Sequence, residues 1–137
     1  MRVRHRVLPV TELASTMTPC ELATQAARAI RALNELTHGG GELTSPGDVR
    51  EIVASLELVG QGLPQLCEQL ARFLVVKHED GELVHGSGLD PDVSVTEVIE
   101  ALSAAGQAAD MMAAALSEAR GASADLVAPA PSPSRGG

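Results

Sequence analysis

The densest group of side chains that could do chemistry lies between residues 77 and 92. It consists of His78, Glu79, Asp80, Glu82 and His85. Imidazoles and carboxylates are ligands for zinc and other divalent cations, but a helical zinc motif places its two histidines four residues apart, and no cysteine lies nearby in the sequence. We interpret the segment as a long, solvated acidic loop. The sequence predicts neither a metal site nor a bound cofactor.

Two cysteines, Cys20 and Cys67, are the candidate nucleophiles. A catalytic thiol needs a histidine within hydrogen-bond reach and a third group that orients the histidine. No such set can be assembled from the spacing of the residues, and we interpret both cysteines as small packing residues that stay reduced. The sequence therefore predicts that the protein has no catalytic residues and is not an enzyme.

A basic arm opens the chain, in which Arg2, Arg4 and Arg6 alternate with Val3 and His5. Cations at alternate positions of an extended segment can contact phosphate groups of a nucleic acid. Without these three arginines, seven basic residues stand against eighteen acidic ones, a net charge of −11, compared with −8 for the whole chain. The acidic body disfavours broad binding to nucleic acid, so a DNA-associated regulator that uses this arm is the alternative functional hypothesis.

Two stretches of equal length carry the same apolar rhythm, with steps of three and four residues. The sixteen seam positions are Val49, Ile52, Leu56, Val59, Leu63, Leu66, Leu70 and Phe73, then Val95, Val98, Leu102, Ala105, Ala109, Met112, Leu116 and Ala119. Each seam predicts a helix with a stripe of about 37 Å, at 1.5 Å per residue, that lies against another helix. The first seam passes Pro64 without a change of phase, which indicates one kinked helix rather than two.

Capping residues predict where the helices begin. Thr18-Pro19, with Glu21 in the first turn, starts a helix over 19–37 that ends before three glycines at 39–41. Ser45-Pro46 starts the second helix. The third starts either at Asp90-Pro91 or at Ser94 and runs to about residue 121.

These elements predict an all-α fold, an antiparallel three-helix bundle built on a long helical hairpin, with the shorter first helix packed along it. We expect a basic N-terminal arm over residues 1–17, the bundle over 18–125 and a disordered tail over 126–137, whose proline- and serine-rich composition cannot form a core.

The apolar side chains of this bundle are small. Hydrophobic residues make up 45% of the chain, but it contains one Phe, no Trp and no Tyr, and eleven of the twenty-four residues from Ala101 to Ala124 are alanine. Alanine contributes far less to burial than leucine, so additional helix contacts from a second copy would help to stabilise the fold. We expect a homo-oligomer, most simply a dimer.

A second apolar stripe lies about 100° around the third helix from its seam. The stripe consists of Ala101, Ala104, Ala108, Met111 and Ala115. A helix that is apolar over more than half its circumference is contacted on two sides, which makes this stripe the candidate interface. The leading hypothesis is a non-enzymatic helical interaction protein, an adaptor or regulatory subunit that self-associates or binds a helix of a protein partner. No apolar run approaches the roughly 18 residues of a membrane span, so we expect no membrane partner and a cytoplasmic location.

Overall fold

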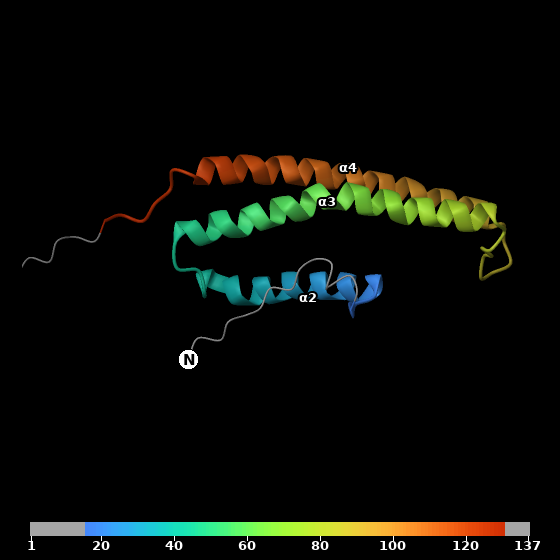
Figure 1. The fold of residues 1–137 in the computed structure, drawn as a ribbon, viewed down its shortest axis with the longest axis horizontal. Coiled ribbons are helices and arrows are strands. Elements are labelled where there is room, and N and C mark those ends of the chain that lie inside the picture. The colour runs from blue at the N-terminus through green and yellow to red at the C-terminus, as the bar shows by residue number, and fades with distance from the viewer. Residues whose placement is uncertain (1–15, 131–137) are drawn as a thin grey trace, which may run out of the picture. The chain divides into compact units, whose positions relative to one another are not determined.

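The computed structural model describes residues 16–130, which form helices and turns without any strand in that range. In chain order they are α2 (Pro19–Thr37), the short 3-10 helix η1 (His38–Gly40), α3 (Pro46–Glu79) and α4 (Pro91–Ser123) (Figure 1). The predicted all-α class is therefore confirmed. Residues 126–130 have no regular secondary structure, and 131–137 of the expected tail lie outside the described residues.

Side-chain caps define the beginnings of the helices. The Thr18 hydroxyl accepts a hydrogen bond from the backbone N–H of Glu21 at 3.1 Å, and the Asp90 carboxylate accepts one from the N–H of Asp92 at 3.0 Å. Both bonds satisfy backbone donors that have no partner within the helix. The predicted starts at 19 and 46 are confirmed, and the third helix takes the earlier of its two predicted starts.

Before α3, the Asp48 carboxylate closes the chain on itself by accepting hydrogen bonds from the backbone N–H and the hydroxyl of Thr44, each at 2.8 Å. Hydrogen bonds to a carboxylate favour its charged form. The pKa of Asp48 is lowered below its ordinary value, first by the backbone bond and then by the hydroxyl bond. The negative charge also lies in the first turn of α3, where it interacts favourably with the helix dipole.

Helix α3 continues through Pro64 as one helix, as the unbroken phase of its seam predicted. It extends to Glu79, and α4 begins at Pro91, so the loop expected over 77–92 is shorter than predicted. The turn uses Gly81 and Gly88, whose φ angles of 71° and 79° lie in the left-handed region that favours glycine.

The chain divides between Leu43 and Thr44 into two compact units. The first contains α2, which has no buried residue. The second contains α3 and α4, which lie side by side (Figure 1). The predicted packing of residues 19–37 along the hairpin, and the predicted domain limits of 18–125, stay predictions.

Contacts between α3 and α4 follow one another in reverse order along the chain. Glu57, early in α3, bonds Arg120 near the end of α4. Further along α3, Gly60 faces Ala113, and Pro64 faces Gly106. The two helices thus form the long hairpin that the sequence predicted.

Small residues form the line along which α3 meets α4. The buried residues of the two helices are Glu57, Gly60, Gly106, Ala109 and Ala113. A Cβ atom placed on Gly60 would lie 3.1 Å from the Cβ of Ala113, which is tighter than most real contacts. The absence of a side chain at Gly60 therefore lets the two backbones approach closely.

Much of the α3 seam, which was predicted to lie against another helix, is not covered by α4. Leu66, Leu70 and Phe73 are 47%, 50% and 60% exposed. Their seam lies about a quarter turn away from the line through Gly60 and Cys67 that faces α4, at 100° per residue. The physical reason is volume, because the close approach at Gly60 leaves no room for large side chains between the helices.

Candidate functional site

Both histidines of the hairpin turn, and Glu82, bond to separate partners. His78, in the last turn of α3, pairs with Asp92 in the first turn of α4. His85 accepts a hydrogen bond from the backbone N–H of Ser87 at 3.2 Å, and Lys77 pairs with Glu82 at 2.5 Å. Within residues 16–130, no group of three or more His, Cys, Asp or Glu side chains could hold a metal ion. These polar contacts tie the turn to the ends of the two helices.

The two candidate nucleophiles have different surroundings. Cys20 is exposed in the first turn of α2, so the expectation that it packs in a core is wrong. Cys67 is half-buried, and its Cβ lies 3.8 Å from the position that a Cβ of Gly106 would occupy. Both thiols are free. Cys67 thus has the packing role that was expected of it.

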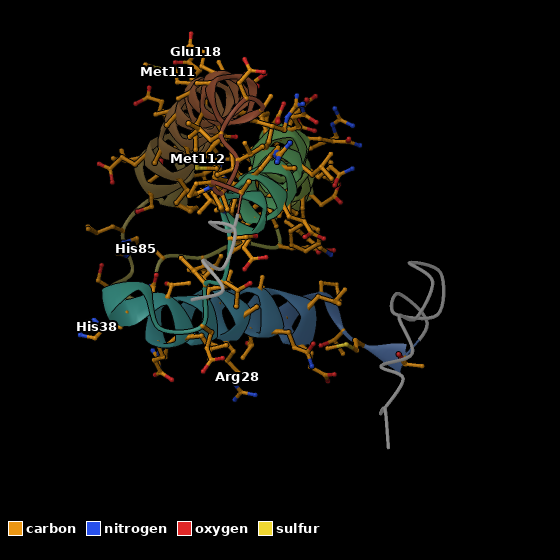
Figure 2. All side chains as sticks on the ribbon, turned by 90° about the vertical axis from the view of Figure 1, so that its left-hand side faces the viewer. Arg28, His38, His85, Met111, Met112 and Glu118 are labelled. Carbon is orange, nitrogen blue, oxygen red and sulfur yellow. The ribbon has the colours of Figure 1, made fainter. Side chains whose placement is uncertain are left out.

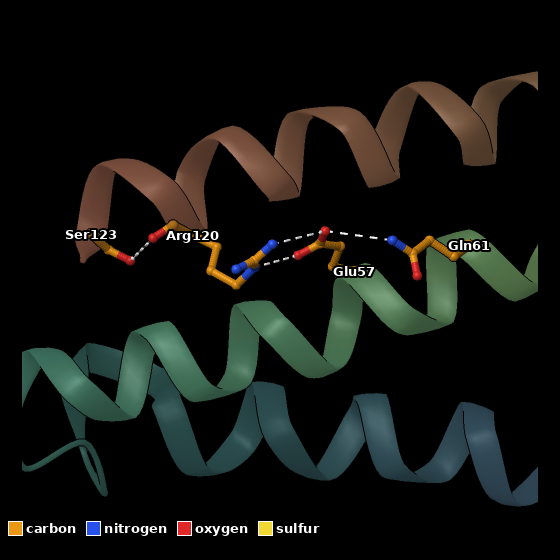
Figure 3. A network of polar contacts seen from close by, with 4 residues as sticks. All are labelled: Glu57, Gln61, Arg120 and Ser123. Carbon is orange, nitrogen blue, oxygen red and sulfur yellow. Dashed lines mark hydrogen bonds and ion pairs between the residues drawn. The ribbon is translucent and has the colours of Figure 1, made fainter.

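Glu57 is a buried carboxylate that the sequence analysis missed. Its side chain lies against α4 and the residue is only 7% exposed. The Arg120 guanidinium donates two hydrogen bonds to it, from Nε to Oε2 at 2.6 Å and from one terminal nitrogen to Oε1 at 3.3 Å (Figure 3). Gln61 donates a third, longer hydrogen bond to Glu57 at 3.5 Å. The Ser123 hydroxyl donates a hydrogen bond to the backbone carbonyl of Arg120 at 2.8 Å.

The electrostatics of this pair are those of a structural link between the helices. The hydrogen bonds from Arg120 lower the pKa of Glu57 below its ordinary value, and burial of the carboxylate opposes them. Glu57 in turn raises the pKa of Arg120. Both groups are therefore charged at neutral pH, and a fully bonded carboxylate of this kind is unsuited to general acid or base catalysis, which needs a pKa near the working pH.

A large apolar surface lies on one side of the hairpin. We call it the seam face, and its exposed members are Val49, Val59, Leu66, Leu70 and Phe73 on α3 with Val98, Ala105 and Met112 on α4. In each helix the seam lies a quarter turn from the contact line in the same rotational sense. Because the helices run in opposite directions, both seams turn to the same side of the pair. The methyl of Met112 is accordingly only 3.1 Å from the position of a Cβ on Gly60.

The candidate interface stripe of α4 is exposed along its whole length. All five members, Ala101, Ala104, Ala108, Met111 and Ala115, are exposed, and Met111 reaches 75%. Figure 2 shows Met112 on the side of α4 nearer α3 and Met111 on its outer side. No charged residue occurs from Ala101 to Ala109. The stripe therefore extends the seam face around α4.

Phe73, the only aromatic residue of the chain, lies near the loop end of the seam face. The ammonium of Lys77 lies 5.7 Å from the centre of its ring, a distance typical of a cation–π contact. The ring is otherwise largely exposed. Exposed aromatic side chains with large contact areas are frequent anchors of protein interfaces.

The opposite side of the hairpin carries several polar side chains. A shallow groove between α3 and α4 is lined there by Glu68, Ser103, Gln107 and Asp110, together with apolar or small residues that include Cys67, Ile99 and Leu102. We call this the polar side of the hairpin, because its lining includes two carboxylates and the seam positions include none. Arg2, Arg4 and Arg6, the predicted phosphate contacts, lie outside the described residues, and the alternative of a DNA-associated regulator stays a prediction.

Comparison with known proteins gives no family for this chain: no family model, curated protein or solved structure matches it. None of the helices in residues 16–130 is both long and apolar enough to span a membrane.

Proposed function

We propose that the protein is a non-enzymatic helical interaction protein, an adaptor or regulatory subunit that binds another helix or a second copy through the apolar surface of its hairpin. One observation carries the proposal: the seam face and the α4 stripe are exposed in the described chain, and none of their members is a charged residue. Exposed contiguous apolar patches of this size mark interaction sites on soluble proteins.

The energetics favour a covered state of this surface. Complete burial of a leucine or phenylalanine side chain contributes about 1.5–3 kcal/mol. Leu66, Leu70 and Phe73 each keep about half of their surface in water, so a partner helix that covers them gains a substantial part of that free energy. The buried core within the second unit consists of alanines, which provide little stabilisation by themselves.

The polar groups of the hairpin support a structural rather than a chemical role. Two ion pairs link the two helices: Glu57 with Arg120, and His78 with Asp92. We therefore propose no catalytic step and no cofactor. The cytoplasm is the compartment we propose, since both cysteines are free thiols, as is typical of proteins in a reducing compartment.

Photo-crosslinking in cells of the native host tests the proposal. A benzophenone amino acid in place of Leu70 or of Met111 is expected to form a covalent adduct of increased mass, because a partner covers both positions. The same group in place of Gln107, which is exposed on the polar side, is the matched control and is expected to form none. If neither Leu70 nor Met111 gives an adduct with any protein, the proposed function is wrong.

A further inference from the structure

We propose that the partner on the seam face is a second copy of this chain, so that two hairpins pack face to face as a four-helix bundle. This inference rests on the proposed function and specifies its partner. The argument comes from the length of the seam face, its lack of charge and its spacing.

The dimensions of the seam face match a second hairpin. Helix α3 has 34 residues and α4 has 33, which corresponds to about 50 Å at 1.5 Å per residue. Two helices 8–10 Å apart present a face about 20 Å wide, or about 1,000 Å² per copy. A stable interface buries about 800 Å² per partner. Helix α2, with 19 residues, is about 28 Å long and could span little more than half of the face.

The charge distribution allows two identical faces to meet. The whole chain carries a net charge of −8, which opposes self-association in general. The seam positions of both helices contain no charged residue, however, and Glu68 and Asp110 lie on the polar side of the hairpin. A face-to-face dimer therefore places no charged seam residue opposite another.

The spacing of the seam is that of a four-helix bundle. Steps of three and four residues pack helices at about 20° to one another, as in most such bundles. Identical copies most often associate about a two-fold axis, where the same patch is used by both copies. Phe73 is expected to be the largest single contributor, since aromatic residues dominate such contacts.

Sedimentation equilibrium of the full chain tests this inference. The wild-type protein is expected to show twice the chain mass of 14.1 kDa. Leu66→Glu buries a charge in the seam face of each copy and is expected to weaken the dimer at least about 100-fold. Gln65→Glu introduces the same charge at the neighbouring exposed position, outside the seam, and is expected to leave the dimer intact. Circular dichroism verifies that both variants keep their helices.

Three results would overturn the second copy. The first is a wild-type mass of 14.1 kDa at every protein concentration. In that case, a crosslink from position 70 to a different protein would still support the proposed function. The second is a Leu66→Glu protein that remains a dimer. The third is a monomeric wild type together with a larger loss of unfolding free energy in Leu66→Glu than in Gln65→Glu. That result would indicate that another part of the same chain covers the seam face.

A milder substitution covers the case in which Leu66→Glu does not fold. Phe73→Gln changes a side chain that is 60% exposed and removes the expected anchor without adding charge. It is expected to raise the dimer dissociation constant at least about 30-fold, a typical effect for an aromatic residue that anchors an interface. An unchanged dissociation constant would contradict the face-to-face dimer.

Discussion

Replacement of Gly60 with leucine is expected to lower the free energy of unfolding by about 1–3 kcal/mol, the usual cost of inserting extra methylene groups into a close-packed contact. The first new carbon would lie 3.1 Å from the Cβ of Ala113 and 3.3 Å from its Cα, which belong to the rigid part of α4. The helices must separate to accommodate it. Urea unfolding followed by circular dichroism, at two protein concentrations, measures the loss.

Gly62→Ala is the matched control for this prediction. Gly62 lies two residues further along the same helix, and no atom outside its neighbouring helix backbone lies within 4 Å of the position of its Cβ. Alanine there is expected to raise the free energy of unfolding by about 0.5–1 kcal/mol, because it restricts the unfolded chain more than glycine does. Gly60→Leu as stable as the wild type would contradict the close approach of the two helices.

Replacement of Arg120 with methionine is expected to destabilise the hairpin clearly at neutral pH. The substitution leaves the Glu57 carboxylate, which is 7% exposed, without its cation and with only the neutral donors Gln61 and Ser117 among its side-chain partners. An unpaired buried charge is more costly than the absence of the whole pair. The double variant Glu57→Met with Arg120→Met is therefore expected to be more stable than Arg120→Met alone, as measured by thermal unfolding.

The effect of Arg120→Met depends on pH with a defined sign. In the wild type the folded pKa of Glu57 is lower than the ordinary value of 4.5, so the pair contributes its full stability above that value and loses it as the pH falls through the folded pKa. In the variant, burial without the cation raises the pKa of Glu57. The stability difference between the two proteins is expected to be largest near pH 7 and to shrink as the pH falls from the raised pKa of Glu57 in the variant to its lowered pKa in the wild type.

Arg72→Met is the control for the pH experiment. Arg72 pairs with Glu68 one turn away on the same helix at 2.7 Å, and both side chains are 68% exposed. Exposed pairs of this kind contribute little to stability. Arg72→Met is expected to change the free energy of unfolding little at every pH. An equally small change for Arg120→Met would show that Arg120 does not stabilise the buried Glu57 carboxylate.

The elements of this fold could be predicted because their signals are local. Thr18 caps α2 through a hydroxyl three residues from the bonded N–H, and such a cap can be recognised without knowledge of the tertiary structure. The continuity of α3 through Pro64 was predictable for a related reason, since a break would have changed the phase of the apolar residues.

The rotation of the helices about their axes could not be predicted from periodicity. The seam of large residues is the stronger apolar signal, but Gly60 and Ala113 allow the closer contact, and that preference depends on volumes in two helices that are far apart in the sequence. Glu57 was missed for a related reason. A carboxylate within a line of small residues resembles a solvated position until its partner, 63 residues away, is known.

The candidate interface on α4 was predictable because excess apolar circumference is a property of one helix. Ala101, Ala108 and Met111 are exposed in the described chain, and their role as an interface stays a prediction. The seam face was a different case, because its members were expected to lie against another helix. Its exposure became evident only when both long helices were placed side by side.

The alanine core of the hairpin has a thermodynamic consequence. Within residues 16–130, no large side chain is fully buried, and the buried hydrophobic residues are Ala109 and Ala113. The heat-capacity change of unfolding increases with the apolar area that becomes exposed to water. For a single copy this change is expected to be below the usual value of about 12–15 cal/mol/K per residue, which gives a flat, wide curve of stability against temperature. Association would make that curve more strongly bent. Unfolding of a dimer also exposes the apolar interface to water, which increases the heat-capacity change.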